Sequence, residues 1–307
     1  MLIAVIGIGG MARRAYLPVL GTRAGLDLIL TSRREEPVRA AQAAYRIPRA
    51  AADLDELLRA GPQAAFVLTP APTHFEIAER LLTAGVDVFI EKPATLRAAQ
   101  TRQLAELADR RGLVLMIGFN RRFAPIHRRV RDLLAGKPAD LAWLQKDRSS
   151  PSSQTLADLY LEDTIHQIDL LRFFCGEGQA VTTRAVTAED KLVSSAATVA
   201  LESGGTAVIA TSFRAGAWRE TYEFGGGGQT VSVEAFQSLH WAHGGGEQRW
   251  QEPYASSWQT TLEARGFTPQ IEHFLDCVST RTQPETSGWV SLKTQILLED
   301  MLEKAIT

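Results

Sequence analysis

An apolar run that ends in a glycine-rich turn opens the chain, and this feature constrains the fold most. Residues 2–7 read LIAVIG, which is typical of a strand buried in a parallel sheet. The turn GIGGMA at 7–12 matches GxGxxA and precedes a helical segment. In that context the glycines form a tight turn that lets a pyrophosphate approach the backbone. We therefore predict a dinucleotide site built by Gly7, Gly9, Gly10, Met11 and Ala12.

The first part of the chain continues as an alternation of strands and helices. Further apolar runs lie at 26–32, 64–69, 86–92 and 113–119, and each is separated from the next by a helical pattern. Alternation of this kind predicts a doubly wound parallel sheet, the Rossmann architecture, over residues 1–120. The predicted fold class is therefore α/β.

The rest of the chain, 121–307, has a different pattern and predicts a second α+β domain. From about 180 to 250 several β-rich runs are joined by turn signals, including four glycines at 225–228 and three at 244–246. The runs are AVTTRAVTA, AATVALE, GTAVIATSF, ETYEFGG, QTVSVEAF and EQRWQE, the last at 247–252. This pattern favours a large open, mostly antiparallel sheet. Two helices close the chain and can pack back on the first domain; they are expected at about 267–281 and 290–305.

Composition excludes several classes of protein. A length of 307 residues suits two domains, and a net charge of −2 gives no field that would recruit nucleic acid or an anionic membrane. No apolar run reaches the roughly 18 residues of a membrane helix, and the N-terminus lacks the basic region of a signal peptide. Cys175 and Cys277 have no metal-ligand spacing, so we expect no metal and a reducing, cytoplasmic location.

The end of the second predicted strand bears on the choice of dinucleotide. NAD-binding proteins usually place an acidic residue there, whereas this chain has Ser32, Arg33 and Arg34. A guanidinium can bind a 2′-phosphate through two hydrogen bonds, and Ser32 can add a hydroxyl donor. We therefore expect NADP, with NAD as the alternative. The other interpretation of the two arginines is a solvated pair without a role in binding.

Two further loops follow predicted strands at the edge where ligands of such sheets bind. One carries Thr69, Pro70 and His74, and we expect it to pass the cofactor, although Thr73 also suits a helix N-cap in a capping box with Glu76. The other carries Glu91 and Lys92 before Pro93. A lysine at this position can reach a nicotinamide and a substrate oxygen.

At this point the chain resembles the Gfo/Idh/MocA family of oxidoreductases. The resemblance rests on GxGxxA, on the block TPAPTHFEIAERLLTAGVDVFIEKPA and on the helix IHQIDLLRFF. Three further segments resemble the MviM-type virulence factor homologues within that family: GFNRRFAP, LEDTIHQID and WQTTLEARGF. The resemblance covers nearly the whole chain.

The resemblance implies hydride transfer in a cleft between two domains, with Lys92 near the nicotinamide and His166 as general acid/base. Relatives usually carry an aspartate four residues before that histidine, but this chain has Glu162 there and Asp163 three residues before. Offsets of three and four residues both lie on one helical face, so either carboxylate is a candidate to assist His166. The chemistry agrees: a histidine can accept the hydroxyl proton of a secondary alcohol, and a lysine can stabilise the alkoxide.

Other polar and aromatic residues have two interpretations each. Asn120, Arg121, Arg122 and Asp169 could bind an anionic group of the substrate or could make structural ties. Tryptophans near the second sheet suit sugar stacking, but they better suit subunit contact. Relatives associate through this sheet, so we expect a homodimer or homotetramer.

Together these features predict an NADP-dependent oxidoreductase acting on a sugar, a polyol or a related hydroxy or keto compound. The unusual Glu162–Asp163 pair motivates an alternative, a dinucleotide-binding regulator or sensor with little turnover. A dinucleotide-dependent hydrolase or lyase without net redox change is a weaker option.

Overall fold

The computed structural model describes residues 1–149, 155–189, 191–251 and 258–306. These residues form two compact units. The first unit comprises 1–119 and 267–293, and the second comprises 120–266 and 294–307. The division falls within the last helix, α11 (Gly288–Glu303).

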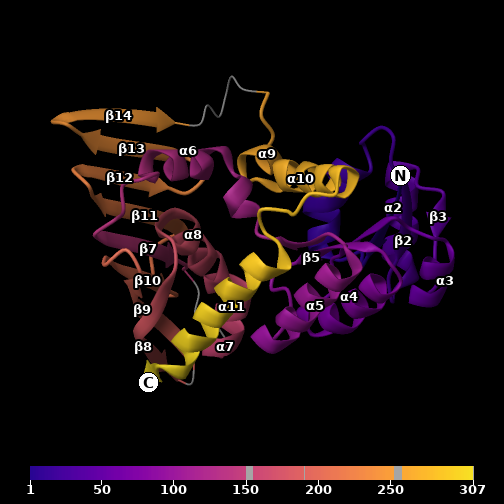
Figure 1. Cartoon of the computed structure of the whole chain (residues 1–307), viewed down its shortest axis with the longest axis horizontal. Coiled ribbons are helices and arrows are strands. Elements are labelled where there is room, and N and C mark those ends of the chain that lie inside the picture. Colours follow the sequence, from indigo (N-terminus) through magenta and orange to yellow (C-terminus); the bar gives the residue numbers. More distant parts are fainter. Residues whose placement is uncertain (150–154, 190, 252–257, 307) are drawn as a thin grey trace. The chain divides into compact units, whose positions relative to one another are not determined.

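A parallel sheet forms the centre of the first unit (Figure 1). Its described strands follow the order β3-β2-β1-β4-β5-β6, so the order reverses between β1 and β4. In chain order the strands are β1 (Leu2–Ile6), β2 (Asp27–Thr31), β3 (Arg49–Ala50), β4 (Ala64–Val67), β5 (Asp87–Glu91) and β6 (Leu115–Gly118). The predicted doubly wound sheet is confirmed, and such a reversal is where ligands bind in sheets of this kind.

Helices connect these strands as the sequence pattern predicts. They are η1 (Ala12–Tyr16), α1 (Leu17–Leu20), α2 (Glu35–Tyr45), α3 (Leu54–Arg59), η2 (Ala71–Thr73), α4 (His74–Thr83) and α5 (Ala98–Arg111). Side-chain hydrogen bonds and backbone conformation determine where some of these helices begin and end. Asp53 caps α3 by accepting a hydrogen bond from Glu56 N at 2.8 Å, and Gly112 ends α5 with a φ of 64°.

An aromatic cluster holds α10 (Phe267–Thr280) against the parallel sheet. The Phe274 ring lies 5.1 Å from that of Phe66 and 5.6 Å from that of Phe89, centroid to centroid, in edge-to-face contacts. Tyr16 joins the cluster from η1. Burying such large rings supplies much of the hydrophobic stabilisation of the unit.

The second unit is built on a mixed, mostly antiparallel sheet, also as predicted. Its described strands follow the order β14-β13-β12-β11-β7-β10-β9-β8-β15. They are β7 (Leu141–Asp147), β8 (Gly178–Ala188), β9 (Lys191–Leu201), β10 (Thr206–Ser212), β11 (Arg219–Gly226), β12 (Gln229–Glu234), β13 (Ser238–His243), β14 (Gly246–Gln251) and β15 (Ala305–Ile306). The strand predicted at 247–252 is β14, and residue 252 lies outside the described residues.

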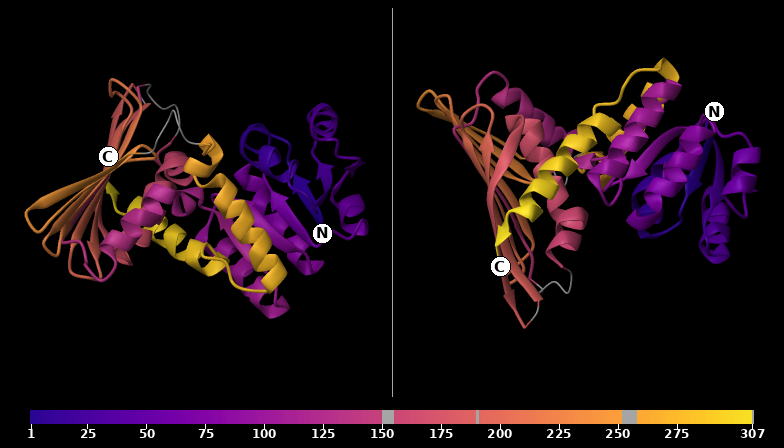
Figure 2. Two further views of the ribbon diagram at one scale, coloured as in Figure 1. Left: turned by 90° about the horizontal axis from the view of Figure 1, so that it is seen from above. Right: turned by 60° about the horizontal axis from the view of Figure 1, so that its bottom comes forward.

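Helices cover one face of this sheet, and the other face is bare of helices in the described residues (Figure 2). The helical segments of the unit are η3 (Asn120–Phe123), α6 (Pro125–Leu134), α7 (Leu156–Leu159), η4 (Tyr160–Thr164), α8 (Ile165–Cys175) and α9 (Thr261–Ala264). Side chains alternate accordingly: Ala142 and Leu144 on β7 are fully buried, whereas Leu141 and Trp143 are 56% and 43% exposed.

Candidate functional site

The glycine loop follows β1 and has the backbone geometry that its sequence predicts. Gly7 has a φ of +92°, and a Cβ there would lie 2.7 Å from Thr69 Cγ2, so only glycine fits. Gly9 differs, because a Cβ on it would meet no atom within 4 Å. Ala12 is fully buried, as a small residue between helix and strand should be, and Met11 is 38% exposed. The loop thus leaves open space beside Gly9.

A cavity of about 700 Å³ lies beside this loop, at the carboxyl ends of β1, β2 and β4. It is lined by Ile6, Gly7, Ile8, Gly9, Thr31, Ser32, Arg33, Arg34, Ala52, Asp53, Leu54, Leu68, Thr69, Pro70, Thr73 and Ile77. The structure therefore brings together seven of the residues predicted to bind cofactor. The others, Gly10, Met11, Ala12, His74, Glu91 and Lys92, lie nearby in the same unit but not among the lining residues.

Arg33 and Arg34 stand exposed at this cavity, directly after Ser32. Neither guanidinium makes an ion pair with any residue of the described segments. Glu35 and Glu36, the nearest acids in sequence, belong to the first turn of α2, where the helix dipole favours them. The end of β2 thus presents positive charge to the cavity.

Thr73 and His74 make the side-chain hydrogen bonds that organise the loop after β4, and His74 also reaches the loop after β5. Thr73 donates to Thr69 Oγ1 and to Pro70 O, both at 2.8 Å. It makes no side-chain cap, so the predicted capping box with Glu76 is wrong: the hydroxyl bonds backward along its own loop. The His74 ring lies between Thr69 O at 2.7 Å and Pro93 O at 2.8 Å. This histidine is buried and links both loops.

Glu91 is the last residue of β5, and Lys92 follows it and forms a cis peptide bond with Pro93. Glu91 is buried; its Oε1 accepts a hydrogen bond from Tyr16, and its Oε2 accepts one from Lys92 N at 2.8 Å. Burial raises the pKa of Glu91, while the Lys92 charge and these hydrogen bonds oppose the rise. The carboxylate therefore fixes the backbone that carries Lys92.

In the second unit, His166 is the second residue of α8 and is 8% exposed. Glu162 and Asp163 precede it in η4, a π-helical turn, and such turns occur often at functional sites. Asp163 has both carboxylate oxygens bound by cations: Lys146 contacts Oδ1, and Arg148 contacts Oδ2 with Nε at 2.9 Å. Burial raises the pKa of Asp163, but these two charges outweigh it and lower the pKa overall.

Lys146 and Glu220 were not singled out by the sequence, yet they form the centre of a buried ion cluster. The register of β7 and β11 pairs them directly, and Lys146 Nζ lies 3.7 Å from Glu220 Oε2. Arg121 contacts both Glu220 oxygens at 2.9 Å, and Tyr222 donates to the same carboxylate. Burial alone would raise the pKa of Glu220, but Arg121 and Lys146 lower it. A signal existed: Lys146 shares the inward alternation of Ala142 and Leu144.

The four residues predicted to contact substrate are Asn120, Arg121, Arg122 and Asp169. Their side chains make hydrogen bonds or ion pairs with other residues of the second unit. Arg121 pairs with Glu220, and Arg122 contacts both oxygens of Asp169 at 2.7 Å. Thr294 also donates to Asp169, at 3.0 Å, and Asn120 donates to Arg265 O at 2.8 Å. All four side chains are at most 9% exposed. Their contacts favour the structural interpretation over substrate binding.

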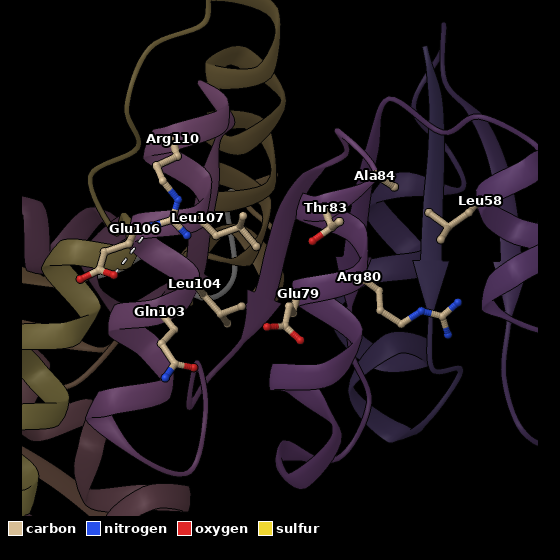
Figure 3. A pocket seen from close by; sticks show the side chains of 10 residues that line it. All are labelled: Leu58, Glu79, Arg80, Thr83, Ala84, Gln103, Leu104, Glu106, Leu107 and Arg110. Carbon is tan, nitrogen blue, oxygen red and sulfur yellow. Dashed lines mark ion pairs between the residues drawn. The ribbon is translucent and has the colours of Figure 1, made fainter.

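A second hollow of about 570 Å³ lies on the surface of α4 and α5 in the first unit (Figure 3). Its lining includes Leu58, Leu104 and Leu107 with charged residues around them, among them Glu106 and Arg110, 3.9 Å apart. None of the predicted site residues lines it.

Within the described segments there is no group of residues that could hold a metal ion. The same segments contain no helix that is long and apolar enough to span a membrane.

The sequence of this chain is similar to those of known oxidoreductases. Residues 1–119 match the model of the Gfo/Idh/MocA oxidoreductase family with NAD-binding Rossmann fold. The chain is 32% identical to the putative oxidoreductase YceM of Salmonella typhimurium, over 99% of this chain and 98% of the relative. It is 29% identical to the inositol 2-dehydrogenase of Rhizobium meliloti, over 78% of this chain and 74% of that protein.

Solved structures show the same fold. The MviM dehydrogenase of Clostridium difficile superposes with a TM-score of 0.89 over 99% of both chains, at 23% identity. The 3-ketoreductase KijD10 of Actinomadura kijaniata, solved with NADP, gives a TM-score of 0.82 at 22% identity and covers 99% of this chain and 97% of its own. Given the family match and the full-length relative, the chain belongs to the Gfo/Idh/MocA family of oxidoreductases.

Proposed function

We propose that this protein is an NADP-dependent dehydrogenase or reductase that acts on a hydroxyl or keto carbon of a sugar, polyol or related compound. The observation that carries the proposal is the cavity beside the glycine loop, where Gly9 leaves open space and Ser32, Arg33 and Arg34 present donors. The cavity fits a dinucleotide, because the glycines admit a phosphate backbone and the arginines suit a 2′-phosphate.

The sugar-like substrate is inferred from relatives. An inositol 2-dehydrogenase and a UDP-N-acetylglucosamine 3-dehydrogenase of Acidithiobacillus ferrooxidans are both similar in sequence to this chain. Both names describe oxidation of a ring hydroxyl.

When bound, the nicotinamide supplies the hydride acceptor or donor. We assign the remaining roles to this chain's own residues. His166 takes the proton of the substrate hydroxyl during oxidation and returns it during reduction. The Lys92 ammonium stabilises negative charge on the reacting oxygen. Because both Asp163 oxygens contact cations, Glu162 is the better candidate for the carboxylate that orients His166.

Binding and turnover test different parts of this proposal. Calorimetric titration should give a lower Kd for NADP than for NAD, and Arg33→Ala should raise the NADP Kd by about 10- to 100-fold, the loss of a charge-assisted contact. The Kd for NAD should hardly change. Tighter binding of NAD would contradict the cofactor assignment.

Turnover is tested by NADPH formation across a panel of inositols, pentoses, hexoses and nucleotide sugars. His166→Gln and Lys92→Met should lower kcat by at least about 100-fold with little change in NADP affinity. Full activity in both variants would contradict the assigned roles. Tight NADP binding without turnover on any compound would instead favour the regulator or sensor.

We also propose that the protein assembles as a homodimer or homotetramer through the bare face of its second sheet. Trp143 stands at the middle of this face, 43% exposed, and pairs in register with Val208 on β10 and Glu223 on β11. Leu141 and Val186 add exposed apolar surface at 56% and 45%. An exposed face of this kind is typical of subunit contacts.

A further inference from the structure

His74 has an unusual hydrogen-bonding environment in the first unit. Its ring is 1% exposed, with Nδ1 lying 2.8 Å from Pro93 O and Nε2 lying 2.7 Å from Thr69 O. Both partners are backbone carbonyl oxygens, which only accept hydrogen bonds. A neutral imidazole carries one N–H and therefore satisfies one of the two carbonyls, while its lone pair faces the other. Only the doubly protonated ring donates to both.

The surroundings of the ring oppose that second proton. Burial is the largest influence and lowers the pKa of His74, and the charge of Lys92 lowers it further. The carbonyls of Pro93, Thr69 and Ala94 act in the opposite direction without restoring the ordinary value. His74 also begins α4, where the positive end of the helix dipole disfavours a cation. At neutral pH the ring is thus neutral, with one carbonyl lacking its donor.

An anion beside the ring would reverse this balance. Thr69, whose carbonyl faces Nε2, lines the cavity assigned to the dinucleotide, and so does Pro70. A dinucleotide carries its pyrophosphate charge into that cavity and excludes water from it. The negative charge favours a positive charge nearby, because Coulombic attraction is strong where the effective dielectric constant is low. Since His74 is already only 1% exposed, the bound dinucleotide adds little to the cost of burying that charge.

We propose that His74 takes up a proton when the dinucleotide binds, so that the imidazolium ties the loop of Thr69 to the loop that carries Lys92. His74 then acts as a positioning residue for Lys92 rather than as a catalytic group. This inference rests on the proposed cofactor site. Its direct consequence is that dinucleotide affinity increases as the pH falls, because the complex holds more protons than the unliganded protein.

Proton uptake is measured directly by calorimetric titration of the whole protein with NADP and with NAD. Titrations at about pH 6.5 in buffers of different ionisation enthalpy give the number of protons bound per dinucleotide. We expect uptake of up to one proton, and a Kd that rises with pH by at most about tenfold per unit. NAD is included because the 2′-phosphate of NADP itself titrates near pH 6.

Two variants assign the proton. In His74→Gln the side chain still donates to one carbonyl but cannot change its charge, so uptake should fall and the pH dependence of Kd should flatten with both dinucleotides. His273→Gln is the matched control, because His273 lies in the same unit and its Nε2 accepts a hydrogen bond from Glu285 N at 3.0 Å. That control should keep the uptake of the wild type.

The outcomes are distinguishable. Dinucleotide binding by the wild type with no proton uptake between about pH 5.5 and 7.5 overturns the inference but leaves the cofactor proposal standing. Equal uptake in the wild type and His74→Gln also overturns it. Failure of the wild type to bind either dinucleotide overturns the cofactor proposal and this inference together. Since the wild-type measurement needs no mutation, poor folding of His74→Gln cannot hide the result.

Discussion

The Tyr16 hydroxyl donates a hydrogen bond to Glu91 Oε1 across 2.5 Å, although 75 positions separate the two residues in the chain. Tyr16 ends η1, which follows the glycine loop, and Glu91 holds the backbone N–H of Lys92. The hydrogen bond thus joins the segment expected to bind phosphate to the segment expected to contact the nicotinamide. Gln270 on α10 also donates to the Tyr16 hydroxyl, at 3.3 Å.

Replacing Tyr16 by Phe should therefore destabilise the fold more than removing an exposed hydroxyl would. The change leaves a buried Glu91 oxygen without its donor, so the free energy of unfolding should fall by about 1–3 kcal/mol in a urea titration. Tyr45→Phe is the control: Tyr45 is only half-buried, and its change should stay within about 0.5 kcal/mol. Equal losses in the two variants would show that the Tyr16–Glu91 bond contributes little.

Two glycines of the same loop should respond differently to alanine. Gly7→Ala places a Cβ against Thr69 at a positive φ, so it should lower both the Tm and the affinity for dinucleotide. Gly9→Ala meets open space in the unliganded protein, so it should fold normally and lose only dinucleotide affinity. Thermal unfolding and calorimetric titration measure the two effects. Unchanged affinity in Gly9→Ala would argue against a phosphate at this loop.

Asp163→Asn should show a pH-dependent loss of stability. The pKa of Asp163 in the folded protein lies below its ordinary value of 3.8, so its ionised form stabilises the fold above that pH. This contribution is lost as the pH falls through the folded pKa. The difference in Tm between wild type and variant should accordingly be large at neutral pH and shrink below about pH 4. A difference that stays constant with pH would contradict the ion-pair account.

Arg122→Met separates the two interpretations of this arginine. Removing the guanidinium leaves a buried Asp169 without its main partner, and the expected cost is about 3–5 kcal/mol in the free energy of unfolding. Arg39→Met is the control, because its pair with Glu35 is exposed and should contribute less than about 1 kcal/mol. Unchanged stability with a raised substrate KM would instead support substrate binding by Arg122.

Trp143→Glu tests the proposed subunit contact. A carboxylate at the middle of the bare sheet face would be buried against a second copy, so the variant should elute as a monomer in light-scattering chromatography. Leu96→Glu, at an exposed apolar residue of the first unit, should keep the wild-type mass. A Trp143→Glu variant that also keeps that mass would place the contact elsewhere.

The sequence predicts the parallel sheet well because each of its longer strands is a continuous apolar run bounded by turn signals. It misses β3, a strand of two exposed residues, and β15, which pairs with β8 through Ala305 and Ile306 alone. It also misses β13, where His240 and Trp241 interrupt the expected alternation. Such strands exist because neighbouring strands supply hydrogen-bond partners, a property of the sheet rather than of the segment.

Within the candidate site, the sequence predicts residues that lie in one motif but not the contacts between residues of different elements. Motifs lead to the glycine loop, Arg33 and Arg34, because their residues follow one another in the chain. The Lys146–Glu220 contact joins residues that meet only through strand register. The partners of Arg121, Arg122 and Asp163 likewise come from other elements, so the sequence alone left their roles open.

The composition of the first unit from 1–119 and 267–293 has a consequence for how the protein is made. A ribosome releases the whole parallel sheet long before it releases Phe274, the residue that covers Phe66 and Phe89. During synthesis, Phe66 and Phe89 therefore lack the contacts that α10 makes with them until residues 267–280 have been added. For the same reason, a fragment cut at residue 119 would expose aromatic surface and be prone to aggregate.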